Sequence, residues 1–442
     1  MTTTTAPSMK VTILAAGAAG MYCGSCIRDN ALALALRRLG HDAVMVPLYT
    51  PVKTDAENAS IGKVFYGGVN VWLQSASRIF RHTPRFLDWL FDRPRFLMWA
   101  GSKGAQTSPA QLGRLTLDII RGEDGPTRKE LKRLAEFLKS ELKPDVITLP
   151  NLMFIGAAKY LREHTGAAVI AECTGEDIFL DAMAEPWKSQ ATALIRERAA
   201  HVSRFVATSR YYAGQMAAYL NVPPERIDVV YPGVPEKDLV TEEQLATRNS
   251  QPATLRTIGY LARICPEKGL DRLVDAAALL RQKPGFDDVK VRAAGYMGKA
   301  NEAWYAGVEK RVAATGLAGH YSYEGEVDRE RKLTLYDGSA LTCTPTAYPE
   351  PKGLYVLEAL ARGCPVVLPH HGSAPELVDA TRGGITTPPG DAPALADALA
   401  TLLESPEQLA ELSQAGHAAV REKFLDTHMA RGMLETFERA RA

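Results

Sequence analysis

The sequence predicts an α/β protein made of two doubly wound domains, each a parallel sheet covered by helices on both faces. Three observations support this fold class. Short apolar segments alternate with helical sequence along most of the 442 residues, a pattern typical of parallel sheets. The alternation stops in a polar segment at 236–255 and then restarts. A chain of this length also exceeds one ordinary core and suits two domains of about 200 residues.

The first domain is expected at 10–235, after a disordered lead at 1–9. It opens with a βαβ unit: the strand "VTILAAG", a glycine-bearing turn, the helix "DNALALALRRLGH" and the strand "AVMVPLY". Asp29 and Asn30 suit the N-cap of this helix, and Gly40 suits its end. Further strands are predicted at 145–150, 168–173 and 204–209.

An insertion at about 51–130 is too long for a simple crossover connection. Between 78 and 99 it interleaves arginines with phenylalanines and tryptophans. One interpretation is a helical subdomain whose arginines extend outward over packed aromatic rings. The other is a face that binds the acceptor or makes a peripheral membrane contact through 78–99.

The second domain is expected at 256–410, with 236–255 as the linker that precedes it. Its strands are predicted at 256–262, 289–295, 321–327, 339–345, 365–370 and 383–391. Helices follow, and the last of them, at 411–442, are expected to cross back to the first domain. Two doubly wound domains in one chain predict a central ligand cleft at the carboxyl ends of both sets of strands.

Composition excludes several classes of protein. A hydrophobic content of 46%, a charged content of 23% and a net charge of +1 indicate a soluble globular protein without the basic excess of a nucleic-acid binder. Six scattered cysteines argue against a disulfide framework and favour a reducing compartment. With no apolar run of 18 residues and no secretory signal, the expected location is cytoplasmic, at the inner face of the membrane if 78–99 binds it.

The segment "YPEPKGLYVLEALARGCPVV" carries two glutamates, Glu350 and Glu358, eight positions apart. It follows the strand predicted at 339–345, so Glu350 lies in a loop and a helix begins near Gly353. A loop carboxylate accepts hydrogen bonds from hydroxyls, while the start of a helix attracts an anion. This arrangement suits a nucleotide-sugar, which has hydroxyls at both ends and phosphates between them.

Two cations, Arg263 and Lys268, follow the first strand of the second domain, in a loop shaped by Pro266 and Gly269. Ligands of doubly wound sheets bind at such loops, and two cations there neutralise a diphosphate. The alternative is a solvated basic loop.

Taken in order, these motifs resemble the retaining family 4 glycosyltransferases, which have the GT-B fold and an E-x7-E signature. The resemblance rests on Glu350 and Glu358 around Gly353, on "GYLARICPEKGLDRLVDA", "AAGYMG" and "YEGEVDRERKLTLYDGSALTCTPT", and on "SRYYAGQMAAYLNVPPERIDVVYPGV" at the end of the first domain. It covers nearly the whole chain except the insertion. Lys352 stands where the family frequently has an aromatic residue.

The resemblance implies transfer of a hexose from a nucleoside-diphosphate sugar, with UDP favoured over GDP and ADP, to an acceptor hydroxyl. Arg263 and Lys268 would stabilise the leaving diphosphate, and Glu350 would contact the donor sugar. The implied donor-binding positions are Gly17, Gly20, Val327, Gly353, Leu354 and Glu358, of which Glu358 would contact the ribose. No cofactor is expected, and the lack of H-E-x-x-H and D-x-D motifs argues against a catalytic metal.

Other polar residues of the first domain have two interpretations each. Thr174, Glu176 and Asp177 follow a strand and are expected to face the cleft, although the histidine that many relatives have near Thr174 is absent. Glu176 or Asp177 would either act on an acceptor hydroxyl or cap the next helix. Cys23 and Cys26 form a C-x-x-C that suggests redox or metal chemistry, without a second C-x-x-C or histidine pair to complete a metal site.

The sequence is also compatible with two other functions. A glucan synthase or phosphorylase on the same fold is suggested by "VFYGGVNVWLQ" at 64–74, but the K-x-G-G motif of that class is replaced by "GAAG". A non-catalytic sugar-nucleotide-binding protein is the other. The acceptor, whether saccharide, lipid-linked or small molecule, and the oligomeric state are not encoded in any motif.

Overall fold

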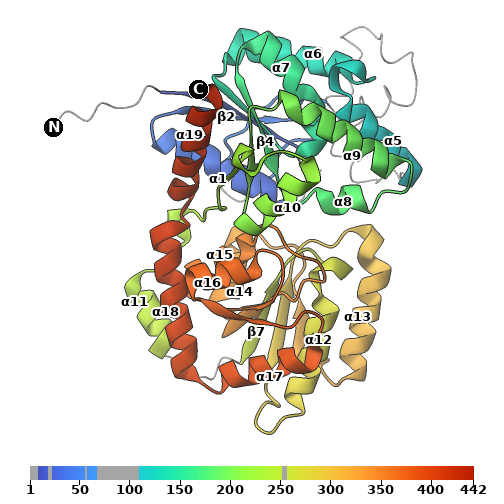
Figure 1. The fold of residues 1–442 in the computed structure, drawn as a ribbon. Helices are drawn as coiled ribbons and strands as arrows, with labels where there is room; N and C mark the ends of the chain where they lie inside the picture. The colour runs from blue at the N-terminus through green and yellow to red at the C-terminus, as the bar shows by residue number, and fades with distance from the viewer. Residues whose placement is uncertain (1–7, 18–21, 55–56, 67–108, 251–255) are drawn as a thin grey trace, which may run out of the picture. The chain divides into compact units, whose positions relative to one another are not determined.

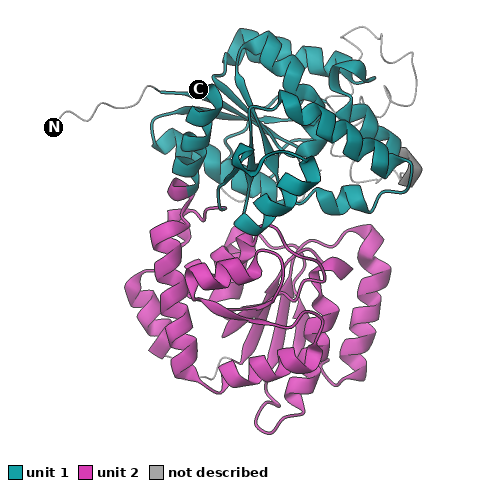
Figure 2. Cartoon of the chain, viewed as in Figure 1, with its two compact units in different colours: residues 1–231, 429–442 teal, residues 232–428 magenta. Residues whose placement is uncertain are grey.

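A computed structural model describes residues 8–17, 22–54, 57–66, 109–250 and 256–442. The chain forms two compact units (Figure 2). Unit 1 comprises Met1–Tyr231 and Met429–Ala442, and unit 2 comprises Pro232–His428. Each unit contains a six-stranded sheet in which all neighbouring strands are parallel. The predicted fold class, two doubly wound Rossmann-like domains, is therefore confirmed.

The sheet of unit 1 has the strand order β2-β1-β3-β4-β5-β6 (Figure 1). Its strands are β1 (Lys10–Ala15), β2 (Asp42–Pro47), β3 (Val146–Leu149), β4 (Ala168–Cys173), β5 (Arg204–Ala207) and β6 (Ile227–Val229). β1 is flanked by β2 on one side and by β3 on the other. The winding direction of the chain therefore reverses at β1, and the loop after β1 lies at this reversal.

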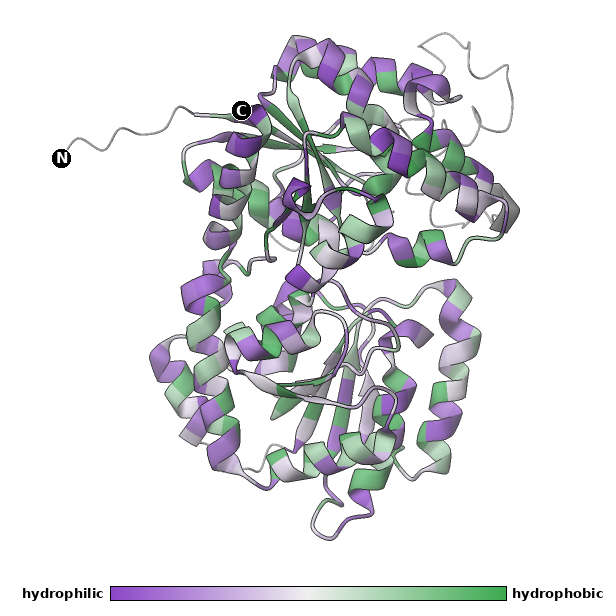
Figure 3. Cartoon of the chain, viewed as in Figure 1, coloured by the Kyte–Doolittle hydropathy of each residue, from purple (hydrophilic) through white to green (hydrophobic). Residues whose placement is uncertain are grey.

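Helices cover both faces of this sheet. They are α1 (Gly24–Arg38), α5 (Pro109–Ile120), α6 (Arg128–Phe137), α7 (Ala158–Thr165), α8 (Asp177–Asp181), α9 (Trp187–Arg198), α10 (Arg210–Leu220) and α19 (Asp426–Arg441). One buried cluster packs Leu36 of α1 and Phe437 of α19 with Ile13 and Ile170 of the strands. A second cluster packs α5 to α10 against the opposite side chains of the strands. The helices carry hydrophilic as well as hydrophobic residues (Figure 3), as expected for a covering layer.

The start of α1 differs from the prediction. The helix begins at Gly24 with Cys23 as its N-cap, so Asp29 and Asn30 lie inside it and the N-cap prediction was wrong. Both side chains are buried, and Asn30 makes tertiary hydrogen bonds, accepting from the amide of Ala59 (2.8 Å) and donating to the carbonyl of Glu57 (2.7 Å). The predicted end is confirmed, because Gly40 follows the C-cap with a φ of 89°.

Part of the predicted insertion belongs to the core of unit 1. Leu117 and Ile120 of α5 are almost fully buried in the cluster beside β3 and β4. The segment 78–99, with its arginines and aromatic residues, lies outside the described residues, as does most of the predicted lead at 1–9. The two interpretations of 78–99 therefore stay predictions.

Unit 2 has the strand order β12-β11-β10-β7-β8-β9. Its strands are β7 (Thr257–Leu261), β8 (Lys290–Ala294), β9 (Tyr321–Tyr323), β10 (Leu341–Cys343), β11 (Val366–Pro369) and β12 (Gly384–Thr387). β7 pairs with both β8 and β10, so the strand order reverses between β7 and β10. In open α/β sheets, ligands bind outside the carboxyl ends of the strands at such a switch point.

The helices of unit 2 are α11 (Glu242–Ser250), α12 (Leu270–Arg281), α13 (Glu302–Ala314), α14 (Arg329–Asp337), α15 (Leu354–Ala361), α16 (Ala374–Thr381), α17 (Ala392–Leu403) and α18 (Pro406–Lys423). None of the helices in the described part of the chain has the length and hydropathy needed to cross a bilayer.

The segment predicted as a linker is structured over its described residues, 236–250. Within 236–255, α11 packs on α18: Leu245 is buried, and Glu242 forms an ion pair with Arg421. The few apolar residues of this segment pack against the rest of unit 2. The polar composition of the segment gave no indication of this packing. The helices at 411–442 were expected to cross back to the first domain. Of these, α18 belongs to unit 2, and residues 429–442 belong to unit 1.

Candidate active site in the second unit

The loops after β7 and β10 meet at the switch point of unit 2. The loop after β7 contains one 3-10 turn, Pro266–Lys268, which ends at Gly269. Gly269 has a φ of 71°, and a Cβ at this position would lie 1.9 Å from the carbonyl oxygen of Pro345. The amide of Ala347 also donates to the carbonyl of Glu267 at 2.8 Å. Only glycine allows this approach of the two backbones.

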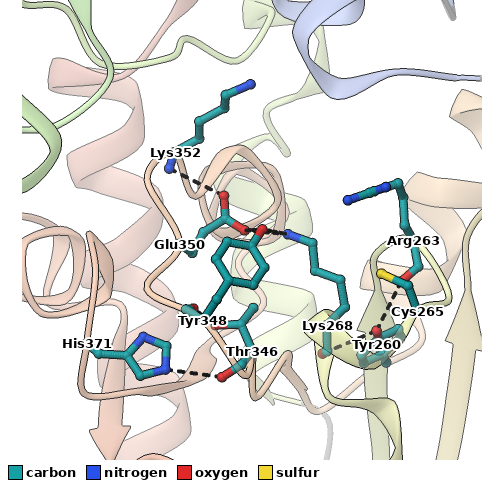
Figure 4. Close-up of polar contacts among 9 residues, drawn as sticks. All are labelled: Tyr260, Arg263, Cys265, Lys268, Thr346, Tyr348, Glu350, Lys352 and His371. Carbon is teal, nitrogen blue, oxygen red and sulfur yellow. Dashed lines mark hydrogen bonds and ion pairs between the residues drawn. The ribbon is translucent and has the colours of Figure 1, made fainter. Parts of the chain in front are cut away.

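These loops bring together Lys268, Tyr348 and Glu350 (Figure 4). The ammonium of Lys268 forms an ion pair with Oε2 of Glu350 and donates to the hydroxyl of Tyr348 at 2.7 Å. The same hydroxyl donates to Oε2 of Glu350 at 2.8 Å. The side chains of Lys268 and Glu350 are only 11% and 10% exposed. We call these three residues the Lys–Tyr–Glu triad.

The triad fixes the charge of its members. Burial raises the pKa of Glu350, but the charge of Lys268 and the hydrogen bonds from Lys268 and Tyr348 outweigh burial, so the pKa lies below its ordinary value of 4.5. Burial and the charge of Glu350 raise the pKa of Tyr348. At neutral pH the carboxylate is therefore ionised and the phenol is a hydrogen-bond donor.

The backbone of Glu350 is held by the loop after β11. Gly372, with a φ of 62°, packs so closely that a Cβ there would lie 2.5 Å from the Glu350 nitrogen. The amide of Ser373 donates to the carbonyl of Glu350 at 2.8 Å. The prediction that Glu350 lies in a loop before a helix is confirmed, and the loop that carries it is fixed by a neighbouring loop.

Arg263 lies on the same loop as Lys268 but differs from it in exposure. Its side chain is exposed and forms no ion pair with any residue in the described ranges. Figure 4 shows its guanidinium on the side of the loop that faces Glu350. Lys268 is thus partly neutralised within the protein, whereas the charge of Arg263 is available to a bound anion.

Gly353 and Leu354 stand where the sequence places the helix start. Gly353 is the N-cap of α15, with a φ of 67°, and Leu354 is its first residue. A Cβ at Gly353 would lie 2.3 Å from a methyl carbon of Leu377. The first amides of a helix have no carbonyl partner within it and form a partial positive charge.

Glu358 lies between α15 and α14. Its carboxylate forms an ion pair with Lys332 at 2.8 Å and accepts from the hydroxyl of Tyr336 at 3.3 Å. The side chains of Lys332 and Glu358 are 10% and 11% exposed. Val327, another predicted donor-binding residue, is buried just before α14. Glu358 is therefore a largely buried, paired carboxylate and not an ordinary surface glutamate.

Sequence reasoning missed two residues of this site, Tyr348 and Lys332. A signal existed for Lys332, which lies four positions before Tyr336 and so on the same helix face. Tyr348 lies two positions before Glu350, but its hydroxyl bridges Glu350 to a lysine 80 positions earlier in the chain. No local pattern encodes such a bridge.

In unit 1 the predicted residues Thr174, Glu176 and Asp177 hold loops together. Glu176 is buried and accepts from the amides of Thr174 (2.7 Å) and Leu152 (2.9 Å), which joins the loops after β3 and β4. Asp177 accepts from the hydroxyl of Tyr212 at 2.5 Å. Neither alternative from the sequence describes this role: Glu176 stands at the N-cap of α8 but its side chain makes no capping bond. A part in acceptor chemistry stays a prediction.

The first loop of unit 1 is described in part. Gly17 has a φ of 80°, and a Cβ there would lie 2.3 Å from the carbonyl oxygen of Thr50, so close approach requires glycine. Gly20 lies outside the described residues. Across the described ranges, no three His, Cys, Asp or Glu side chains are grouped to hold a metal ion.

Two family models cover most of the chain. The model "Glycosyl transferases group 1" matches residues 242–419, and "Glycosyl transferase 4-like domain" matches residues 28–233. With two Rossmann-like units and a cationic switch point in the second, the molecule falls in the class of GT-B glycosyltransferases. Within that class, the chain belongs to the family 4 glycosyltransferases.

Solved structures share the fold along almost the whole chain. Anabaena HepE in complex with UDP and glucose is 18% identical, with a TM-score of 0.66 over 97% of this chain and 99% of that chain. Sucrose-phosphate synthase from Thermosynechococcus elongatus is 17% identical, with a TM-score of 0.69 over 97% of this chain and 98% of that one.

Curated relatives match over shorter stretches. A D-inositol 3-phosphate glycosyltransferase of Rhodococcus opacus is 28% identical over 249 residues, 54% of either chain. A phosphatidyl-myo-inositol mannosyltransferase of Mycobacterium leprae is 31% identical over 190 residues, 43% of this chain and 47% of the relative. The chain spans about half the length of the curated relatives it matches.

Proposed function

We propose that the protein transfers a hexose from a nucleoside-diphosphate sugar, with UDP as the favoured nucleotide, to an acceptor hydroxyl with retention of configuration. The observation that carries this proposal is the Lys–Tyr–Glu triad at the switch point of unit 2, with the exposed Arg263 on the same loop. Family membership supports it, and so do the UDP and glucose bound by HepE.

The leaving diphosphate is handled by Arg263 and Lys268. As the bond between sugar and phosphate breaks, negative charge grows on the departing oxygen, and cations fixed in place stabilise that charge without reorganising. An ammonium has three donors; Tyr348 and Glu350 take two of those of Lys268, which leaves one for a phosphate oxygen. The first turn of α15 adds its partial positive charge.

The two glutamates bind hydroxyls in this proposal. Glu350 is held ionised by Lys268, so it accepts hydrogen bonds from the donor sugar and does not act as an acid. Each ionised carboxylate has about four acceptor positions, and Glu358 uses two of them for Lys332 and Tyr336. The others suit the two hydroxyls of a ribose. Neither role requires a metal ion, and no cofactor besides the donor enters the proposed reaction.

The acceptor is proposed at the level of its chemistry. The curated relatives named above act on inositol phosphate and on phosphatidyl-myo-inositol, which supports a ring polyol, free or lipid-linked, as the first acceptor to test, followed by saccharides. A cytoplasmic location and a peripheral membrane contact through 78–99 stay predictions from the sequence.

A thermal-shift panel tests the donor. A ligand at 100 times its Kd stabilises a protein by about 2.7 kcal/mol, so at equal concentration the tighter ligand gives the larger rise in melting temperature. We expect UDP and UDP-hexoses to raise the melting temperature more than GDP or ADP. The shift should be the same in EDTA, because the proposed binding needs no metal ion. The Arg263→Gln variant should fold normally but show a smaller shift. Absence of any shift with all of these nucleotides would refute the donor assignment, and binding without turnover across the acceptor panel would favour a sugar-nucleotide-binding protein.

Removal of the Tyr348 hydroxyl tests the triad. A hydrogen bond to a charged group contributes about 1.5–3 kcal/mol, so Tyr348→Phe should lower kcat at least about tenfold, since Lys268 and Glu350 lose a shared partner. KM for the donor should change less than kcat. Tyr305→Phe is the matched control, because among the described residues its hydroxyl forms a hydrogen bond only with that of Tyr321 (3.2 Å) in the same unit. Equal kcat values for the two variants would exclude a role for the bridge.

A further inference from the structure

Cys23 and Cys26 frame the first turn of α1. Cys23 is the N-cap, with extended backbone angles, and Cys26 is the third residue of the helix. None of the six cysteines, all of which lie in the described ranges, forms a disulfide; five are buried, and Cys23 is partly exposed. The pair therefore consists of one accessible and one shielded sulfur on the same helical turn.

The two residues lie one helical turn apart at the start of α1. Interaction with Cys23 is the largest of the influences that raise the pKa of Cys26, followed by burial. A disulfide joins residues whose Cα atoms are about 4.4–6.8 Å apart and whose Cβ atoms are about 3.5–4.5 Å apart. Helix geometry places Cα atoms three positions apart at about 5 Å, while their Cβ atoms are about 5–6 Å apart. The pair can therefore form an S–S bond if the first turn of α1 adjusts so that the Cβ atoms approach by about 1–2 Å.

Within the described residues, too few potential metal ligands lie near these thiols to complete a metal site. The described residues contain no group of three His, Cys, Asp or Glu side chains around them. A zinc site ordinarily needs three or four protein ligands. The C-x-x-C is therefore better explained by thiol chemistry than by metal binding.

We propose that Cys23 and Cys26 form a redox-active dithiol, which is oxidised reversibly to an intramolecular disulfide by exchange with a small-molecule disulfide such as glutathione disulfide. The Cys23 thiolate attacks one sulfur of the small disulfide, whose S–S bond breaks and releases one thiolate. Cys26 then loses its proton to solvent and attacks the Cys23 sulfur, which releases the second thiolate. Two protein thiols are oxidised, and one disulfide is reduced to two thiols.

The environment of each sulfur suits its part in this exchange. The start of a helix favours a thiolate over a thiol, and Cys23 occupies that position with access to solvent. Interaction with Cys23 and burial raise the pKa of Cys26, which keeps it protonated until the mixed disulfide forms beside it. The proposal concerns thiol chemistry alone and does not depend on the proposed transferase activity.

The test uses the purified full chain in glutathione buffers of graded oxidation, followed by acid quench, alkylation of free thiols and peptide mass mapping. We expect a Cys23–Cys26 disulfide whose fraction rises with the oxidised share of glutathione and returns to zero with dithiothreitol. Cys26→Ser should accumulate a mixed disulfide of Cys23 with glutathione, because no second thiol resolves it, whereas Cys23→Ser should leave Cys26 unmodified.

Cys364→Ser is the matched control, because its thiol donates to the carbonyl of Ser339, a bond that serine retains. It should form the Cys23–Cys26 disulfide like the unchanged protein. The proposal fails if both thiols stay reduced under conditions that fully oxidise a thioredoxin-type dithiol, if Cys26→Ser gathers no mixed disulfide, or if the purified protein contains stoichiometric zinc that oxidation releases.

Discussion

Replacing Lys268 with methionine should lower kcat/KM for glycosyl transfer by about 10²–10³-fold, the cost of removing one preorganised group that stabilises transition-state charge. The substitution keeps the length of the side chain and removes only the ammonium, which contacts Glu350 and Tyr348. Initial rates with a UDP-hexose and the best acceptor of the panel provide the measurement. A folded Lys268→Met protein with unchanged kcat/KM would remove Lys268 from the mechanism.

The structure also predicts what this substitution does to stability. In the unchanged protein the lowered pKa of Glu350 means that its stabilising contribution is complete above pH 4.5 and is lost as the pH falls through the lowered pKa. Without Lys268, burial is the main remaining influence and should raise this pKa. Lys268→Met should then be least stable relative to the unchanged protein at neutral pH and approach it in acid.

Two further variants separate the loss of activity from the loss of stability. Lys268→Met with Glu350→Gln removes both charges and should recover most of the stability at neutral pH, because no unpaired charge is buried, while activity stays low. Lys283→Met is the matched control: its ion pair with Asp397 (2.6 Å) is largely exposed, and exposed pairs contribute about 0–1 kcal/mol. Its activity should be unchanged. Recovery of activity in the double variant would contradict the proposed role of Lys268.

The fold was predictable because its signal is local. Each strand of a buried parallel sheet is a short apolar run, and all the predicted strands appear within a few residues of their expected positions. The errors occurred where local composition misleads. The polar segment that contains α11 looks like a linker, yet its apolar residues Val240 and Leu245 are buried. Asp29 and Asn30 look like N-caps, but both lie buried within α1, and Asn30 bonds to Glu57 and Ala59 of the segment after β2.

The site was predictable in its backbone positions and not in its contacts. Loops after the strands of a doubly wound sheet gather at one edge, so Arg263, Lys268 and Glu350 could be placed near one another from strand order alone. The ion pair that partly neutralises Lys268 and the hydroxyl of Tyr348 that bridges it to Glu350 depend on side-chain geometry between distant segments. The sequence therefore suggested two equivalent cations, whereas the structure distinguishes an exposed Arg263 from a paired Lys268.

The second large effect is expected in unit 1, at an ion pair that sequence reasoning did not identify. Arg28 of α1 and Glu172 of β4 form an ion pair with side-chain exposures of 4% and 2%. Burial lowers the pKa of Arg28, but Glu172 and Asp29 outweigh burial and the pKa is raised, so the guanidinium is charged. Neither residue had an assigned role, because a single glutamate in the strand "AVIAEC" gives no hint of its partner.

Replacing one member of this pair should destabilise unit 1 by about 3–5 kcal/mol, since the other charge is left buried without its partner. Arg28→Met and Glu172→Gln are the two single variants, and hydrogen exchange of peptides from α1 and β4 measures the effect within unit 1. The control is Lys159→Met, whose pair with Glu123 (3.0 Å) is 37% and 17% exposed; exposed ion pairs contribute little to stability, so this variant should be as stable as the unchanged protein.

The double variant Arg28→Met with Glu172→Gln distinguishes a stabilising pair from one that is merely costly to break. Replacing both members of a buried ion pair with neutral side chains is often nearly neutral for stability, so most of the loss should be recovered. The carboxylate of Asp29 lies 3.4 Å from the guanidinium of Arg28 and loses this positive charge in any Arg28 variant. The recovery of stability should therefore be incomplete. If hydrogen exchange in α1 and β4 is as slow in the single variants as in the unchanged protein, the pair is solvated in solution and does not contribute to the stability of unit 1.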